Sequence, residues 1–275
     1  MILLNGIYYS DFSEVPKEIV SSFIDNPSLS VSIRYGSSKI YFWEEHYFQL
    51  VSLMRISRMD IPLDFTPDFL SKSIKKIISD FHDIKKSYLI SIKVSKSEQI
   101  TKKLIIPKSN YLIEVIKNDS IFHNKEKYSM DVYNDFKISL SSFNNIEFSF
   151  IISLSKIFSF ENNLDDSIIL DNNNKVVRSA FGEVFCITNN DIKTPKTSKF
   201  HRDSVYKYEF IKYLKSLNKY NIIEKSFSPF EIVKSEELFI VSVRNGFQSV
   251  TSFKKKKFVF HKTSLIYEKF KSFIN

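Results

Sequence analysis

The chain has 275 residues, of which 43% are hydrophobic and 26% are charged, the balance of a globular protein rather than a disordered one. Forty lysines and arginines against 31 aspartates and glutamates give a net charge of +9 at pH 7. The single cysteine, Cys186, excludes a disulfide framework and a cysteine-only metal site, and is typical of a reducing compartment. We find no apolar run near the roughly 18 residues that span a bilayer and no basic secretory leader, and therefore expect a cytoplasmic protein without a membrane partner.

The positive charge raises the question of nucleic-acid binding, because contact with phosphates needs clustered lysines and arginines. The chain is rich in Lys, Asn, Ile and Phe and has only four glycines, a bias expected of an AT-rich genome. Only Lys254–Lys257 form a continuous basic run, and the flanking Phe253 and Phe258 predict a turn between two strands. We therefore expect ordinary surface lysines, with nucleic-acid binding as a distant alternative.

The first half of the chain alternates between strand-like and helix-like segments. Lys39–Trp43 is β-branched and aromatic and predicts a strand. A helical spacing of apolar residues follows at Tyr47, Leu50, Val51 and Met54. Thr66 and Pro67 predict the N-cap and first residue of a long helix. Its buried face is predicted to comprise Leu70, Ile74, Ile77, Ile78 and Phe81.

Two predicted buried strands, 88–94 and 111–116, are followed by a polar stretch, 117–127. Because polar stretches separate compact regions, we predict a smaller N-terminal α/β domain at 1–118 and a linker at 119–127. The remaining residues, 128–275, are predicted to form a larger C-terminal α/β domain.

The second half continues the alternation. It predicts strands at 128–140, 167–170, 176–187 and 238–243, helices at 150–160 and 204–217, and a turn at 171–175. Val205, Tyr208, Ile211 and Leu214 are predicted to share the buried face of the second helix, and Ser228–Glu231 has the pattern of a capping box. The mixture predicts an α/β (α+β) protein.

Several kinds of site find no support in the sequence. The histidines at 46, 82, 123, 201 and 261 lack metal-ligand spacing, so we expect no metal. No phosphate-binding loop, dinucleotide fingerprint or nucleophile elbow is present. We expect a structural role for His46 and a buried position for Cys186.

Several short segments, in order along nearly the whole chain, resemble the class IV (fold type IV) pyridoxal-phosphate (PLP) enzymes, especially members from Bacteroidota. This family includes branched-chain and D-amino-acid aminotransferases and aminodeoxychorismate lyases. The segments are Ser32–Arg34, Lys39–His46, Met54–Pro62, Asn163–Leu170, Val176–Val177, Glu183–Phe185 and Gly246–Val250. The resemblance implies a two-domain fold with PLP held between the domains, and a homodimer.

The same resemblance implies that the usual catalytic positions are substituted. The family's Schiff-base lysine lies about twenty residues before Asp165, where this chain has Asn145. The carboxylate that keeps the pyridine nitrogen protonated is replaced by Arg178, and the arginine that holds the phosphate is replaced by Gln49. His201 stands where a threonine is expected before Arg202. Further departures lie at Asp25–Ser28, Ser30–Val31 and Lys196–Phe200.

Two readings of the function follow. The first is a catalytically degenerate relative, a pseudoenzyme that keeps the dimer and an interdomain cleft for a small anionic ligand. The second is an active aminotransferase or aminodeoxychorismate lyase that uses another lysine, Lys137 or Lys156. For Arg178, two roles are open: a salt bridge, for instance to Glu183, or contact with a carboxylate or phosphate ligand in the former cofactor cleft. His201 and Arg202 are candidates for binding an anion before the helix that starts at Ser204.

Overall fold

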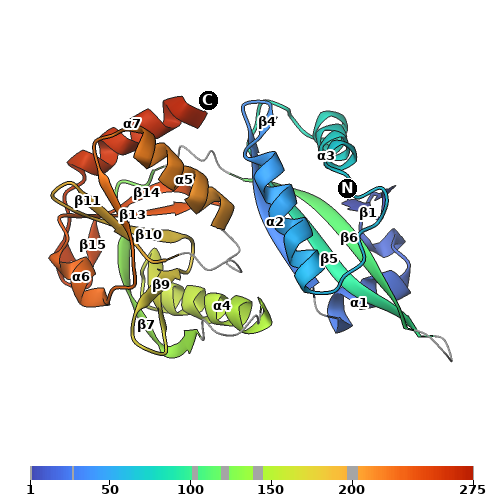
Figure 1. Cartoon of the computed structure of the whole chain (residues 1–275), viewed down its shortest axis with the longest axis horizontal. Helices are drawn as coiled ribbons and strands as arrows, with labels where there is room; N and C mark the ends of the chain where they lie inside the picture. The colour runs from blue at the N-terminus through green and yellow to red at the C-terminus, as the bar shows by residue number, and fades with distance from the viewer. Residues whose placement is uncertain are drawn as a thin grey trace. The chain divides into compact units, whose positions relative to one another are not determined.

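The structure is a computed structural model that describes residues 2–26, 28–100, 105–118, 124–138, 145–196 and 204–274. The chain forms two compact units, Met1–Asp119 (unit 1) and Ser120–Asn275 (unit 2), drawn in Figure 1. Each unit combines helices with β-sheet, which confirms the predicted α/β (α+β) class. The predicted linker, 119–127, starts at the last residue of unit 1.

Unit 1 is built on a six-stranded sheet with the order β2-β1-β6-β5-β3-β4. The strands are β1 (Ile2–Leu4), β2 (Ile7–Tyr9), β3 (Ser28–Gly36), β4 (Lys39–Ile40), β5 (Tyr88–Ile100) and β6 (Ile105–Lys117). Its helices are the 3-10 turn η1 (Phe12–Glu14), α1 (Lys17–Asp25), α2 (Trp43–Ile56) and α3 (Pro67–Phe81). All strand pairs of this sheet are antiparallel.

The two faces of this sheet are covered differently. Leu3, Ile33 and Ile113 point to one face and form the main core of unit 1 with α2 and α3. Leu4 and Leu112, one residue along in their strands, point to the opposite face, where residues of α1 pack. Figure 1 shows α2 lying along the strands of this sheet.

Unit 2 contains two five-stranded sheets, with the orders β16-β15-β7-β8-β9 and β12-β11-β10-β13-β14. The strands of the first are β7 (Ser129–Ile138), β8 (Asp166–Asp171), β9 (Val176–Ser179), β15 (Ser252–Phe253) and β16 (Lys256–Lys257). Those of the second are β10 (Glu183–Thr188), β11 (Asp191–Thr194), β12 (Asn221–Glu224), β13 (Glu237–Ser242) and β14 (Gly246–Val250). The helices are α4 (Asn145–Glu161), α5 (Ser204–Ser216), α6 (Pro229–Lys234) and α7 (His261–Ile274).

The two sheets of unit 2 enclose one apolar core. Met130 and Ile168 of the first sheet and Val184 and Ile240 of the second belong to the same buried cluster. The outer face of the first sheet is covered by α4, and the outer face of the second by α5 and α7 (Figure 1). Stacked and edge-on aromatic rings join the second sheet to these helices, namely Phe185, Phe210, Phe239, Phe247 and Phe270.

Most of the predicted helices and strands are present, but they begin or end at other residues than predicted. The N-cap is confirmed at Thr66, whose side chain accepts a hydrogen bond from the backbone N–H of Phe69. The strand predicted at 39–43 is only two residues long, because Trp43 already begins α2. The predicted strand 176–187 is two strands, β9 and β10, joined by a turn.

Two residues that were predicted to be buried are exposed, and one predicted helix cap is not formed. Phe81 is exposed because it ends α3, where no further turn covers it. Tyr208 is 58% exposed, since α5 is buried on almost all sides and only a narrow stripe faces solvent. Ser228 does precede α6 but makes no side-chain capping bond, and Glu231 pairs with Lys193 instead.

Part of the predicted linker is held by unit 2. The backbone N–H of Lys125 donates to Oε1 of Gln248 (2.9 Å), and Nε2 of Gln248 donates back to the carbonyl of Lys125 (3.1 Å). Asn124 Oδ1 accepts from the backbone of Ser249. Residues 124–127 therefore enter unit 2 as an ordered approach to β7.

Candidate functional site

The positions implied by the family resemblance are spread over several elements. Gln49 lies in α2 of unit 1, and its side chain is half-buried. Asn145 is the first residue of α4, and Arg178 lies in β9, both in unit 2. His201 and Arg202 lie outside the described residues, as does the loop 197–200. Of the implied positions in unit 2, Arg178 is therefore the one whose side-chain contacts the structure describes.

Arg178 is a buried cation. Only 3% of the residue is exposed, and its Nε donates to the carbonyl of Ser179 at 2.8 Å. It lies opposite Ile169 in the antiparallel pairing of β8 and β9. Burying a guanidinium is costly unless hydrogen bonds and an opposite charge compensate it. A nearby carboxyl, Asp166, provides such a charge.

Asp166 is the acidic group of this region. It is fully buried, and its carboxyl accepts from the backbone N–H of Ser167 (2.7 Å) and the hydroxyl of Tyr128 (3.2 Å). Burial raises the pKa of Asp166 to about 6, against hydrogen bonds from Ser179, Ser167 and Tyr128 and the charge of Arg178, which lower it. Burial and the same carboxyl also raise the pKa of Tyr128 well above its usual value.

The turn between β9 and β10 is held tightly beside Arg178. The backbone N–H of Gly182 donates to Oγ of Ser179 (2.9 Å), and the backbone N–H of Ser179 donates to the carbonyl of Gly182 (2.8 Å). A Cβ on Gly182 would lie 2.6 Å from the carbonyl oxygen of Val241, so only glycine fits here without movement. The turn therefore fixes the direction in which β10 leaves β9.

Glu183, the first residue of β10, forms a buried ion pair with Lys207 of α5. The Nζ–Oε2 distance is 3.2 Å, and both side chains are 1% exposed. Nζ of Lys207 also donates to the carbonyl of Pro195. The sequence analysis did not predict this pair, and the position of Lys207 between two tyrosines of an amphipathic helix was the available signal.

The two alternative lysines lie at different places. Lys137 donates to Oδ1 of Asn174, in the turn between β8 and β9, at 2.6 Å. Nζ of Lys156 lies 5.0 Å from the ring centre of Phe181, in the turn between β9 and β10. Because these turns lie at opposite ends of β9, the two amines occupy different ends of the strand that carries Arg178.

Lys156 also lies far along its helix from Asn145. Eleven residues separate them, which in an α-helix corresponds to about three turns and a rise of roughly 16 Å. Positions 145 and 156 therefore lie on the same face of α4 but about three turns apart along the helix axis. An amine at position 156 does not replace an amine at position 145 without a different arrangement of the site.

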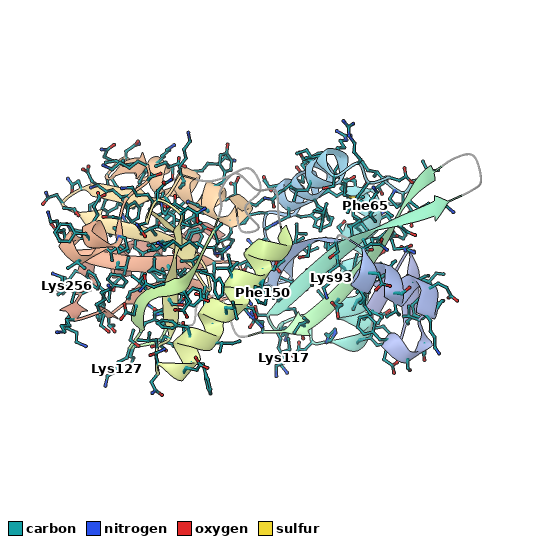
Figure 2. All side chains as sticks on the ribbon, turned by 90° about the horizontal axis from the view of Figure 1, so that it is seen from below. Phe65, Lys93, Lys117, Lys127, Phe150 and Lys256 are labelled. Atoms are coloured by element: carbon teal, nitrogen blue, oxygen red, sulfur yellow. The ribbon has the colours of Figure 1, made fainter. Side chains whose placement is uncertain are left out.

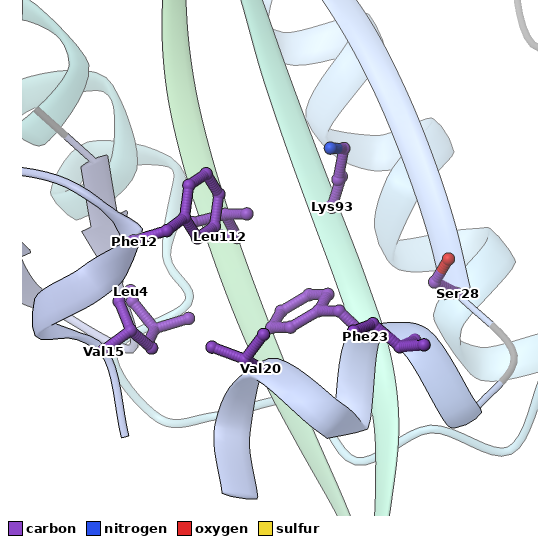
Figure 3. A pocket seen from close by; sticks show the side chains of 9 residues that line it. Leu4, Phe12, Val15, Val20, Phe23, Ser28, Lys93 and Leu112 are labelled. Carbon is purple, nitrogen blue, oxygen red and sulfur yellow. The ribbon is translucent and has the colours of Figure 1, made fainter. Parts of the chain in front are cut away.

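Unit 1 contains an apolar cavity of about 350 Å³ between its sheet and the segment η1–α1 (Figure 3). Leu4, Phe12, Val20 and Leu112 line it, and the polar groups at its wall are Lys93 and Ser28. The ammonium of Lys93 pairs with Glu114 at 3.1 Å. The cavity therefore offers a ligand mainly van der Waals contacts, and its one charged group, Lys93, is already paired with Glu114.

Other sequence expectations concern single residues. His46 is buried in α2, and Cys186 is buried in β10, where desolvation raises the pKa of its thiol to about 12. The buried position predicted for Cys186 is confirmed. Within the described part of the chain, no group of three or more metal-binding side chains comes together. No helix in the same ranges has both the length and the apolar character required to cross a bilayer.

The buried ion pair predicts a specific pattern of stability changes. Lys207→Met should cost about 3–5 kcal/mol of unfolding free energy, because it leaves the Glu183 carboxylate buried without its partner. The double variant Lys207→Met/Glu183→Leu should be more stable than Lys207→Met, since no buried charge remains. Urea denaturation followed by circular dichroism measures both changes. As a control, Lys262→Met removes a half-exposed pair with Glu236 and should cost below about 1 kcal/mol; an equal cost for both lysines would contradict the argument.

Asp166 predicts a pH dependence. Because the folded protein holds this proton more tightly than the unfolded chain, the stabilisation from Asp166 is complete below about pH 4 and is lost as the pH rises through about 6. The loss is about 3 kcal/mol. The difference in unfolding free energy between the wild type and Asp166→Asn should therefore fall over this range. A rising difference would mean that Arg178 and the hydrogen bonds outweigh burial.

Solved structures place this fold among known proteins. No protein-family model matches the sequence, and no curated protein matches it significantly. Among solved structures, a branched-chain aminotransferase from Thermoproteus uzoniensis, with norvaline, matches with a TM-score of 0.85 and 15% identity over 99% of this chain and 94% of that one. An aminotransferase from Brucella abortus bound to PLP matches with a TM-score of 0.82 and 10% identity, over 99% and 98% of the two chains.

A third structure represents a different reaction. The putative 4-amino-4-deoxychorismate lyase from Legionella pneumophila matches with a TM-score of 0.72 and 13% identity, over 91% of this chain and 92% of that one. Aminotransferases and a lyase thus share this architecture, which agrees with the resemblance seen in the sequence. The chain has the fold of the fold type IV pyridoxal-phosphate enzymes.

Proposed function

We propose that this chain is a catalytically degenerate relative of the class IV aminotransferases. The observation that carries the proposal is the arrangement of amines in unit 2. Position 145 at the start of α4 is an asparagine, and Lys137 and Lys156 contact residues at opposite ends of β9. An amide cannot form the covalent bond that a lysine amine forms with the cofactor aldehyde.

The charge beside β9 supports the same proposal. When bound in this fold, PLP supplies an electron sink for a carbanion at the substrate's α-carbon, and a protonated ring nitrogen strengthens that sink. Arg178 is a cation at the position where the resemblance implies a carboxylate, and the fully buried Asp166 is held by Tyr128 and Ser167. A cation favours the unprotonated ring, so these residues do not fit the cofactor in its catalytic form.

An active enzyme is the second candidate, and Lys156 is the residue that favours it. It lies on the same face of α4 as Asn145, and its ammonium contacts Phe181, three residues beyond Arg178. This reading needs the cofactor to sit about three helical turns from the usual position of its lysine. We therefore rank it below the degenerate reading.

The remaining expectations belong to the proposal. The degenerate protein would keep the homodimer of the family, which analytical ultracentrifugation measures directly. It would bind a small anionic ligand near Arg178, because a buried guanidinium matches a carboxylate or a phosphate. Cytoplasmic location and the absence of nucleic-acid and membrane partners remain expectations from composition.

Adding PLP to the purified protein and removing free cofactor by desalting tests the proposal. We expect a spectrum without a cofactor band, because position 145 offers an amide in place of the amine that would retain the cofactor. A band in a one-to-one ratio that borohydride makes permanent would contradict the degenerate reading. Mapping the modified lysine by mass spectrometry would then distinguish Lys156 from Lys137, and Lys156→Ala should abolish the band if that residue is used.

Restoring the implied residues is a second test. Asn145→Lys combined with Arg178→Glu should retain PLP after desalting, because it supplies both the amine and the carboxylate. The matched control Asn162→Lys with Arg58→Glu makes the same residue changes elsewhere and should retain none. Retention by the parent but not by the double variant would show that positions 145 and 178 are assigned wrongly.

A further inference from the structure

A second cavity, in unit 2, coincides with the longest lysine run of the sequence, Lys254–Lys257. It has a volume of about 530 Å³ and lies beside β7 and the β15–β16 hairpin. Its lining includes Lys254, Lys255 and Lys256, the residues predicted from the sequence to form a turn. The structure confirms a hairpin here, with Ser252 opposite Lys257 and Phe253 opposite Lys256.

The hairpin is anchored so that its lysines border the cavity. Phe253 pairs with Met130 in the parallel ladder between β15 and β7, and the backbone N–H of Lys254 donates to the carbonyl of Met130 at 3.0 Å. Lys254 has a φ of 52°, the left-handed conformation that turns the chain at this point. In Figure 2, Lys256 lies at the periphery of unit 2.

The floor of the cavity is apolar. Met130 and Phe253 are 1% and 0% exposed, and the half-buried Leu164 and Val233 complete the lining from the segment before β8 and from α6. A flat or aliphatic group placed on Leu164 and Val233 would remove their remaining apolar surface from water, whereas Met130 and Phe253 are already buried. The volume is within the range of small-molecule sites, about 300–1,000 Å³.

The charges at the cavity are not balanced. Three lysines and one acid, Asp131, line it, which gives 3 − 1 = +2. Asp131 lies 4.0 Å from Lys254, and the neighbouring Asp165 is already paired with Lys125 at 3.0 Å. Among the described residues, neither Lys255 nor Lys256 forms an ion pair with a carboxylate. Lys256 instead lies 5.9 Å from the ring centre of Phe258.

We propose that this hairpin cavity is a binding site for a phosphate monoester that carries an aromatic or apolar group. A phosphate monoester has a charge of about −1.5 to −2 at pH 7, which matches the +2 of the lining. The lysine ammonium groups bind the phosphate oxygens as point charges, and the ring lies on the half-buried side chains of Leu164 and Val233. The site involves neither Asn145 nor Arg178, so it stands independently of the proposed function.

Isothermal titration calorimetry with adenosine 5′-monophosphate tests this site, using the full chain at low salt. Adenosine 5′-monophosphate should bind more tightly than either adenosine or inorganic phosphate, because only the monoester uses both the floor and the lysines. Lys255→Ala/Lys256→Ala should weaken binding by about tenfold or more. The control Lys215→Ala/Lys269→Ala removes the same charge from exposed positions on α5 and α7 and should leave binding unchanged. Asp131→Asn should tighten binding, because it raises the charge of the lining to +3.

Three results would overturn the proposal. The first is no binding of adenosine 5′-monophosphate to a wild-type protein that unfolds cooperatively. The second is equal weakening by the two double-lysine variants, which would reflect net charge rather than this site. The third is preferred binding of a single-stranded oligonucleotide, with affinity that rises with its length and falls steeply with salt, which would identify a nucleic-acid surface.

Discussion

The ion pair between Lys207 and Glu183 is the constraint on which the arrangement of unit 2 depends. Both charged groups are almost fully removed from water, which is costly unless each keeps its partner. Lys207 belongs to α5, Glu183 begins β10, and Lys207 also binds the carbonyl of Pro195 after β11. The helix can therefore occupy only one position over the sheet without leaving a buried charge unpaired. The ring contacts of Phe210 with Phe185 and Phe270 fill the same interface with apolar surface.

The start of β10 is fixed from its other side as well. The close approach of Gly182 to Val241 and the hydrogen bonds of Ser179 hold the turn that links β9 to β10. The same turn follows directly on Arg178, so the buried guanidinium, the turn and the ion pair form one rigid region. Asp166 adds a further buried carboxyl to this region. The carboxyl of Asp166 is held by hydrogen bonds from Tyr128 and Ser167 within unit 2.

The fold of a protein and the chemistry of its site depend on different residues and can change independently. The aminotransferases and the lyase to which the chain is similar share its architecture at 10–15% identity, so the fold tolerates replacement of most side chains. Core packing depends on volume and pattern, which many residues satisfy, whereas a covalent cofactor needs one amine at one place. A change at one such place can therefore remove the chemistry while the fold is kept, and the proposal for Asn145 and Arg178 rests on this difference.

The sequence by itself determined the elements whose signals are local. The N-cap at Thr66, the buried stripe of α3, the alternation of strands and helices in both halves and the lysine hairpin after Phe253 depend on neighbouring residues. Short segments in family order were also enough to identify the fold. Local patterns failed at Phe81 and Tyr208, because burial there depends on what packs against each side of the helix.

Only the tertiary structure decided which charges are buried and how they are compensated. Glu183 and Lys207 are 24 residues apart in the sequence, and Asp166 meets Tyr128 across 38 residues, so no local pattern connects them. The cavity beside Lys254–Lys256 likewise needs β7, α6 and the segment before β8 together. The physical reason is that desolvation depends on everything that surrounds a group, whereas helix and strand preferences depend mainly on the residue and its neighbours.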